Sequence, residues 1–267
     1  MIKSIIFGII QGLTEFLPVS SSGHLVLSQH FLNKGVENSD LTFEVFLHLG
    51  SLLAVFIYFR KDIANLFLSI FKWDKNENTV NNHKTILYLL IATFVTGIFG
   101  FTCKDFFESL FSNALLVAVF ISVTGIILFI SDKLSEGKLN THDLGFKKSL
   151  LIGLGQTIAI TPGISRSGTT IAFSLFTKMK REEAARFSFL LSIPAILGAN
   201  IGEINSLLNL NKLAFINYSA GFLAAFISGY LVIGLLLSMI KKAKLKIFSY
   251  YCWTVSLISI ILISLGY

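Results

Sequence analysis

The sequence predicts an all-α, polytopic membrane protein with six transmembrane helices and two re-entrant helix-break-helix hairpins in an inverted-topology repeat. Of its 267 residues, 54% are hydrophobic and only 14% are charged, and the mean hydropathy is +0.74. Soluble domains carry about 25% charged residues, so this composition excludes a soluble enzyme. Uncharged runs such as 213–240 and 247–267 are also long enough to cross a hydrocarbon core of about 30 Å.

Hydropathy places the six spans in order along the chain. They are expected at roughly 41–59, 85–101, 113–131, 186–203, 213–240 and 247–266. Two further apolar segments, 2–32 and 149–177, are each interrupted by Pro, Gly and Ser, which is typical of a re-entrant hairpin. The polar stretches between the spans are loop-sized. We therefore expect a single integral membrane domain over 1–267, with repeat halves at about 1–131 and 149–267.

Basic residues fix the expected orientation of the spans. Most of the 22 Lys and Arg residues fall in the four loops at 60–84, 133–148, 178–186 and 241–246. Because loops on the inner side are enriched in Lys and Arg, both termini are expected on the periplasmic or outer side. The same asymmetry accounts for the net charge of +7 without a nucleic acid partner, since no basic soluble domain is present.

The two hairpin segments repeat one polar phrase. Residues 11–23 read QGLTEFLPVSSSG and residues 156–168 read QTIAITPGISRSG. Three predicted spans separate the two copies, and this odd number inverts the second relative to the first. Hydroxyls and charged groups are costly inside lipid, so two matched polar breaks predict one composite site near the membrane midplane.

The first break offers groups suited to phosphate chemistry. Gln11 and Glu15 are four residues apart and share a helix face. Ser21 and His24 are three apart at the start of a second half-helix, an arrangement that suits a hydroxyl nucleophile with a nearby base or proton donor. The N–H groups at such a helix start also attract anions.

The second break adds Arg166, a permanent cation with a fork that matches phosphate oxygens. Each feature also has a purely structural interpretation, because a Pro-Ser-Gly break can be a kink and serines can bond back to a helix carbonyl. Glu15 alone could be a structural acid and Arg166 alone could reach an interface. Their recurrence in one repeated frame favours function. Glu44 and His48 also share a helix face, but a solvated helix end explains them more simply than a lining role.

Both phrases resemble the signature motifs of the undecaprenyl pyrophosphate phosphatase family, integral membrane enzymes associated with bacitracin resistance. The matching stretches are QGLTEFLPVSSSGHL at 11–25 and PGISRSGTT at 162–170. The resemblance implies hydrolysis of the C55 isoprenoid pyrophosphate to its monophosphate, which recycles the carrier lipid for peptidoglycan and cell-wall synthesis. It also implies a bacterial plasma (inner) membrane location, a pocket open to the outer side, and a divalent metal, Mg²⁺ or Ca²⁺.

The resemblance also assigns roles by motif position. Glu15, Ser21, His24 and Arg166 are the expected catalytic residues, with Ser21 as nucleophile and Arg166 as phosphate ligand. Phosphate contacts are expected from five hydroxyls and the arginine: Ser20, Ser22, Ser165, Ser167, Thr170 and Arg166. Glu15 and Gln11 are the expected metal ligands. Many members have Glu where this chain has Gln11, whose neutral carbonyl oxygen is a weaker ligand for Mg²⁺ or Ca²⁺.

Two alternatives remain open at this point. Inverted repeats that meet at broken helices are also typical of secondary carriers, so the chain could be a transporter or flippase for an anionic isoprenoid lipid. Within the enzyme hypothesis, a metal-activated water could attack directly in place of Ser21. The expected partners are the polyprenyl pyrophosphate substrate and membrane lipid, and a homodimer is left open.

Overall fold

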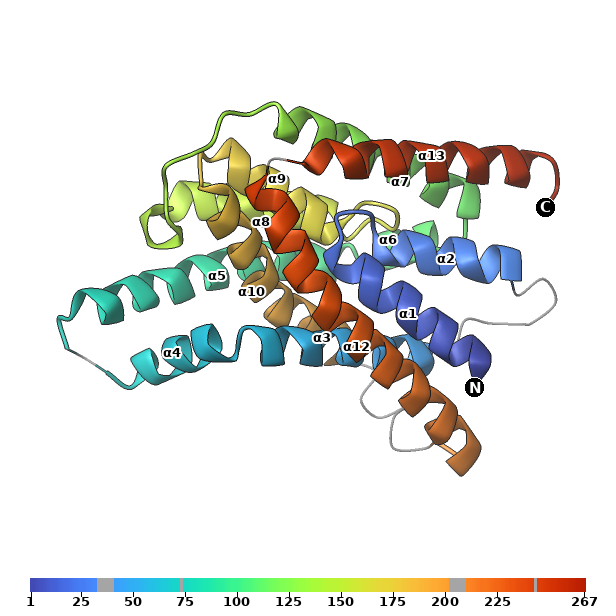
Figure 1. The fold of residues 1–267 in the computed structure, drawn as a ribbon, viewed down its shortest axis with the longest axis horizontal. Helices are drawn as coiled ribbons and strands as arrows, with labels where there is room; N and C mark the ends of the chain where they lie inside the picture. Colours follow the sequence, from blue (N-terminus) through green and yellow to red (C-terminus); the bar gives the residue numbers. More distant parts are fainter. Residues whose placement is uncertain (33–40, 73, 202–209, 243) are drawn as a thin grey trace.

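The protein is described here by a computed structural model, which describes all residues except 33–40, 73, 202–209 and 243. The described part is all-helical and contains no β-strand, only one isolated bridge between Leu139 and Met179. The predicted all-α class is confirmed (Figure 1). Both termini lie at one end of the molecule, on the right in this view.

In the described part of the chain, four helices are long and apolar enough to cross a membrane by themselves. They are α5 (Glu77–Thr102), α7 (Ala114–Asp132), α12 (Lys212–Lys241) and α13 (Leu245–Ser264). A fifth candidate is the pair α3 (Leu41–Tyr58) and α4 (Arg60–Ile70), which is bent by 79° at its break. The polytopic membrane architecture is therefore supported, whereas the exact count of six spans stays a prediction.

The predicted span at 186–203 corresponds to α10 (Arg181–Asn200), which is not among these candidates. Its first two turns carry Arg181, Glu182, Glu183 and Arg186, and these charges lower its hydropathy. Arg181 is buried and donates to the carbonyl oxygens of Asp132 and Leu134, at 3.2 and 3.0 Å. Arg181 thus ties the start of α10 to the end of α7 and the residues that follow it.

Several helices extend beyond the apolar windows that predicted them. α5 begins eight residues before the predicted span, because the side chain of Asn76 caps it by accepting a hydrogen bond from Asn78 N at 3.1 Å. The predicted loops also contain α4, α6 (Lys104–Leu110) and the 3₁₀ turn η1 (Thr141–Asp143). Hydropathy detects the part of a helix that lies in lipid and does not detect polar helical ends.

Both predicted breaks are present. The first lies between α1 (Ile2–Phe16) and α2 (Ser21–Leu32), and the second between α8 (Phe146–Ile158) and α9 (Arg166–Phe176). At 1.5 Å per residue, each of these helices is only about 17 to 23 Å long, too short to cross a hydrocarbon core of about 30 Å. The second arm of each hairpin starts on the same serine cap: Gly23 N donates to Ser20 Oγ, and Gly168 N donates to Ser165 Oγ.

The packing of helices repeats with the halves exchanged. α1 packs on α12 and α8 packs on α5, while α3 packs on α12 and α10 packs on α5. The last helix of each half, α7 and α13, pack on each other. An inverted repeat would produce this exchange of partners. The inverted relation of the two halves in a membrane nevertheless stays a prediction.

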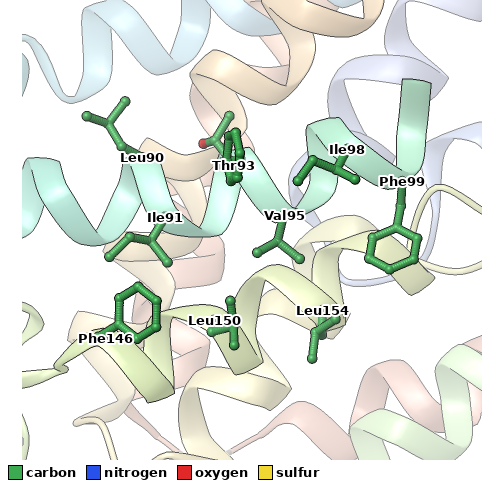
Figure 2. A pocket seen from close by; sticks show the side chains of 10 residues that line it. Leu90, Ile91, Thr93, Val95, Ile98, Phe99, Phe146, Leu150 and Leu154 are labelled. Atoms are coloured by element: carbon green, nitrogen blue, oxygen red, sulfur yellow. The ribbon is translucent and has the colours of Figure 1, made fainter. Parts of the chain in front are cut away.

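The two equivalent helix contacts differ in how closely they pack. A Cβ on Gly12 of α1 would lie 2.1 Å from Ser228 Oγ and 2.3 Å from Ala225 O of α12, so only glycine fits there. The contact of α8 with α5 instead leaves an apolar groove of about 750 Å³ (Figure 2). Its lining includes Phe146, Leu150 and Leu154, which are four residues apart along one face of α8.

Candidate active site

The two breaks meet each other in the middle of the fold. A Cβ on Gly23 would lie 3.0 Å from Gly163 Cα in the second break, and a Cβ on Gly168 would lie 3.1 Å from Pro18 Cβ in the first. Ser167 Oγ also donates to Leu17 O at 3.2 Å. The two polar segments are therefore brought together, as the sequence predicted for a composite site.

Thr124 of α7 fastens the second break. Its hydroxyl donates to Gly163 O at 2.9 Å and accepts a hydrogen bond from Ser165 N at 2.9 Å. Gly163 has a positive φ of 93°, a conformation that glycine adopts without strain. Sequence reasoning missed Thr124, because an isolated threonine in an apolar span carries no signal of the partner it will meet.

Glu15 is the centre of the site. Its Oε1 accepts a hydrogen bond from Arg166 Nη2 at 2.5 Å, and its Oε2 accepts one from Ser21 Oγ at 2.6 Å. Gln11 Nε2 also donates to Oε2, at 3.0 Å. The side chains of Glu15 and Arg166 are only 7% and 15% exposed, so each charge depends on the other for compensation.

Arg166 is the first residue of α9, and its guanidinium is also in contact with α10. Nη1 donates to Ser188 O at 3.4 Å, and Ser188 Oγ shares a hydrogen bond of 2.6 Å with Thr170 Oγ1. Ser188 was not singled out in the sequence. It links the start of α9 to α10 and so fixes where the arginine enters the gap.

Ser21 and His24 both lie at the start of α2, but their hydrogen bonds go to different partners. Ser21 donates to Glu15, whereas His24 Nδ1 is 2.7 Å from Ser20 O and His24 Nε2 is 2.9 Å from the hydroxyl of Tyr251. In this structure the group placed to take the proton of Ser21 is thus Glu15. The predicted catalytic role of His24 stays a prediction.

The other predicted phosphate-binding hydroxyls are mostly enclosed. Ser20, Ser165, Ser167 and Thr170 are at most 2% exposed, while Ser22 is half-buried. Ser20 and Ser165 serve as helix caps, and Thr170 Oγ1 donates to Arg166 O at 2.8 Å. These hydroxyls shape the backbone around Arg166, and their contact with a phosphate stays a prediction.

Oxygen ligands for a divalent cation are present but few. Among the described residues there is no group of three or more His, Cys, Asp or Glu side chains that could hold a metal ion. Gln11 Oε1 is buried without a hydrogen-bond partner, but so is Oε1 of Gln156 at the equivalent position of the second copy. Mg²⁺ commonly uses one or two carboxylates plus phosphate oxygens of the substrate, and Glu15 with Gln11 fits that mode.

His48 of α3 is closer to the site than its sequence position suggested. It interacts electrostatically with the carboxylate of Glu15, and its Nδ1 is 2.9 Å from Glu44 O. Glu44 in turn accepts a hydrogen bond from Gln29 Nε2 of α2 at 2.9 Å. The lining role of His48 stays a prediction. The shared helix face of Glu44 and His48 was the available signal.

Comparison with known proteins identifies the family of this chain. Residues 4–258 match the family model described as bacitracin resistance protein BacA. A protein of Methanobrevibacter smithii named undecaprenyl-diphosphatase is 48% identical over 97% of this chain and 96% of its own length. Proteins of the same name from Methanosphaera stadtmanae and Halothermothrix orenii are each 42% identical, over 98% and 97% of both chains, respectively.

The match extends over nearly the whole chain and includes both broken hairpins with Glu15, Ser21 and Arg166. The protein therefore belongs to the bacitracin resistance protein BacA family.

Proposed function

We propose that this protein is a membrane phosphatase that hydrolyses undecaprenyl pyrophosphate to undecaprenyl phosphate and inorganic phosphate. The observation that carries the proposal is the double hydrogen bonding of Glu15, which joins the hydroxyl of Ser21 to the guanidinium of Arg166 across the two breaks. A nucleophile, a base and an anion-binding cation thus lie within one hydrogen-bonded chain. The reaction would recycle a carrier lipid for cell-wall synthesis and counter bacitracin.

Substrate binding uses the charge of the second hairpin. The fork of Arg166 and the amino-terminal ends of α2 and α9 face the region where the breaks meet, and both favour phosphate oxygens. An incoming phosphate competes with Glu15 for Arg166. Because the phosphate takes over part of the guanidinium, the carboxylate of Glu15 becomes a better proton acceptor at the moment the substrate is bound.

The first chemical step is an in-line attack by Ser21. Its Oγ forms a bond to the terminal phosphorus, its proton passes to Glu15 Oε2 at 2.6 Å, and the bridging P–O bond breaks to release undecaprenyl phosphate. Water then attacks the phosphoserine, Ser21 Oγ leaves phosphorus and regains the proton from Glu15, and inorganic phosphate departs. Direct attack by water, with Ser21 as a binding group only, is the competing chemistry.

A divalent cation, Mg²⁺ or Ca²⁺, would be held by Glu15 and Gln11 together with substrate oxygens. Such an ion would supply neutralisation of the charge that develops on the pyrophosphate. The chain's own part is to aim the oxygens: Gln11 Nε2 donates to Glu15 Oε2 and thereby fixes the carboxylate relative to α1.

The isoprenoid tail is hydrocarbon and needs an apolar surface. We assign it to the groove between α5 and α8, whose lining is almost entirely apolar (Figure 2). Part of this lining belongs to α8, the helix that leads into the second break. The protein would act from the plasma membrane with both termini on the outer side, since the basic loops favour that orientation.

The test is phosphate release by purified protein from undecaprenyl pyrophosphate, with and without a chelator. Release is expected from the wild type, and it should fall by at least 100-fold in Glu15→Gln, which keeps the shape but cannot take a proton (about 10²–10⁴-fold for a lost general base). Absence of release together with counterflow of labelled lipid in vesicles would instead favour the transporter or flippase alternative.

A further inference from the structure

His24 is held in one tautomer by the backbone. Its Nδ1 is 2.7 Å from Ser20 O, and a carbonyl oxygen can only accept, so Nδ1 carries the proton. In the neutral ring Nε2 then has a free lone pair. The hydroxyl of Tyr251, 2.9 Å away, donates to it. Both ring nitrogens are therefore committed, one to the first break and one to α13.

Tyr251 also fixes the plane of the ring. The rings of His24 and Tyr251 are stacked with centroids 5.6 Å apart and an interplanar angle of 8°. A stacked ring with a hydrogen bond at its edge has one orientation, whereas a hydrogen bond alone would allow rotation about Cβ–Cγ of His24. Tyr251 is 44% exposed, so its stacking and hydrogen bond with His24 are not contacts of a buried core residue.

The neighbours of Tyr251 set its register against the first break. Cys252 Sγ lies 3.9 Å from Pro18 O, and Trp253 Nε1 donates to Ser122 O of α7 at 3.1 Å. A Cβ on Gly125 would lie only 2.5 Å from Trp253 Nε1, so the indole occupies space that only a glycine leaves. α13 thus cannot slide along α7 without removing Tyr251 from His24.

We propose that Tyr251 is a positioning residue that acts through His24. It holds His24 as the Nδ1–H tautomer with Nε2 as a proton acceptor beside the first break. The proposal rests on the proposed phosphatase function and adds His24 to its second step. The water oxygen bonds to phosphorus as the Ser21 Oγ–P bond breaks, the proton of the water passes to His24 Nε2 as the Tyr251 hydroxyl moves off that nitrogen, and Ser21 Oγ regains its proton from Glu15. His24 then returns its proton to solvent as inorganic phosphate departs.

The first measurement separates turnover from binding. Tyr251→Phe keeps the stacked ring and removes the hydroxyl, while Tyr250→Phe removes the hydroxyl of the preceding residue, whose ring packs against Trp253. We expect Tyr251→Phe to lower kcat for phosphate release about 10- to 100-fold with KM within about twofold, because proton transfer is affected and substrate contacts are not. Tyr250→Phe should match the wild type. The thermal midpoint should be equal in all three proteins.

The second measurement reads the tautomer directly and requires no turnover. In protein with ¹⁵N-labelled histidine, the signals of His24 are assigned by their loss in His24→Gln. The wild type should show Nδ1 protonated and Nε2 as an acceptor, and Tyr251→Phe should shift the Nε2 signal toward that of a ring exposed to water. This readout stands even if the protein releases no phosphate, so failure of the proposed function is distinguished from failure of the proposal.

Two results would overturn the proposal. One is an unchanged Nε2 signal and unchanged kcat in Tyr251→Phe. The other is a result of the double variant: Tyr251→Phe lowers the residual rate of His24→Gln by the same factor as it lowers the rate of the wild type. Tyr251 would then act without His24. Equal residual rates of the single His24→Gln and the double variant support it.

Discussion

The carboxylate of Glu15 and the guanidinium of Arg166 form an ion pair of 2.5 Å although the two residues are 151 positions apart in the chain. One comes from the last turn of α1 and the other from the first residue of α9, so the pair joins the two halves of the protein at the site. Because of this ion pair, the phosphate of the substrate must compete with Glu15, the proposed base, for the guanidinium of Arg166.

Breaking this pair should cost stability as well as activity. Arg166→Gln leaves the buried charge of Glu15 without compensation, and the free energy of unfolding should fall by about 3 to 5 kcal/mol. The double variant Glu15→Gln with Arg166→Gln removes both charges and should recover most of that stability while remaining inactive. Thermal unfolding in detergent measures the first effect, and phosphate release measures the second. Recovery of activity in the double variant would contradict the assigned roles.

The covalent route predicts phosphate on Ser21. Enzyme quenched in acid during turnover of ³²P-labelled substrate should carry label, and Ser21→Ala should carry none and lose at least about 100-fold in kcat. Ser238→Ala is the control, since its hydroxyl donates to Leu235 O at 2.7 Å within α12, outside both breaks, and it should keep the label. An active and unlabelled Ser21→Ala protein would show that water attacks directly.

The groove between α5 and α8 predicts a dependence on chain length. Leu154→Trp narrows the groove and should raise KM for the C55 substrate about 10-fold, while KM for a C15 analogue with the same pyrophosphate stays unchanged. Leu231→Trp places the same ring on a 68% exposed position of α12 and should have no effect. Equal changes for both substrates would place the tail elsewhere.

Close packing of α1 on α12 predicts a sharp response to one methyl group. Gly12→Ala would bring Cβ within 2.3 Å of Ala225 O, so α1 must move, and both stability and activity should fall because α1 carries Glu15. Overpacking of this kind costs about 1 to 3 kcal/mol. Gly97→Ala in α5, where a new Cβ meets nothing within 4 Å, should be neutral or slightly stabilising. Comparable losses in both variants would contradict the close approach.

Ser20 combines two opposing effects. Its φ is +74°, a region that costs a non-glycine residue about 1 kcal/mol, while its hydroxyl caps α2 through Gly23 N at 3.2 Å. Ser20→Gly relieves the strain and loses the cap, so stability should change little. Ser20→Ala loses the cap and keeps the strain, and it should be less stable than Ser20→Gly by about 1 kcal/mol. A Ser20→Ala protein more stable than Ser20→Gly in thermal unfolding would contradict backbone strain at Ser20.

The sequence was sufficient to predict the breaks, because serines, a carboxylate and an arginine inside apolar segments are too costly to be incidental. The same cost predicted that the breaks would meet. The sequence was not sufficient for the partner of Ser21, which is Glu15 on the other side of the Pro18 break and six residues away. Helical spacing pointed to His24, but the chain changes direction between the two helices and brings the carboxylate to the hydroxyl.

Contacts with distant elements were also beyond reach. Tyr251 is 227 residues from His24 and looks like one more aromatic residue of an apolar span. The bend between α3 and α4 at Phe59 was missed for a related reason: hydropathy falls at Arg60 whether the chain leaves the membrane or turns along it. A single sequence contains the residues of such contacts but no measure of which pairs meet.

The mutual packing of Gly23 on Gly163 and of Gly168 on Pro18 has a consequence for synthesis on the ribosome. The tip of the first hairpin cannot make its contacts until the second hairpin has been synthesised. Because chains grow at about 5 to 20 residues per second, the first tip waits on the order of ten seconds for the second. During that interval Glu15 lacks Arg166, its partner in the second break. Newly made amino-terminal halves should therefore be degraded by quality-control proteases sooner than longer chains. A pulse-chase experiment that compares the lifetimes of stalled chains ending before and after α9 tests this.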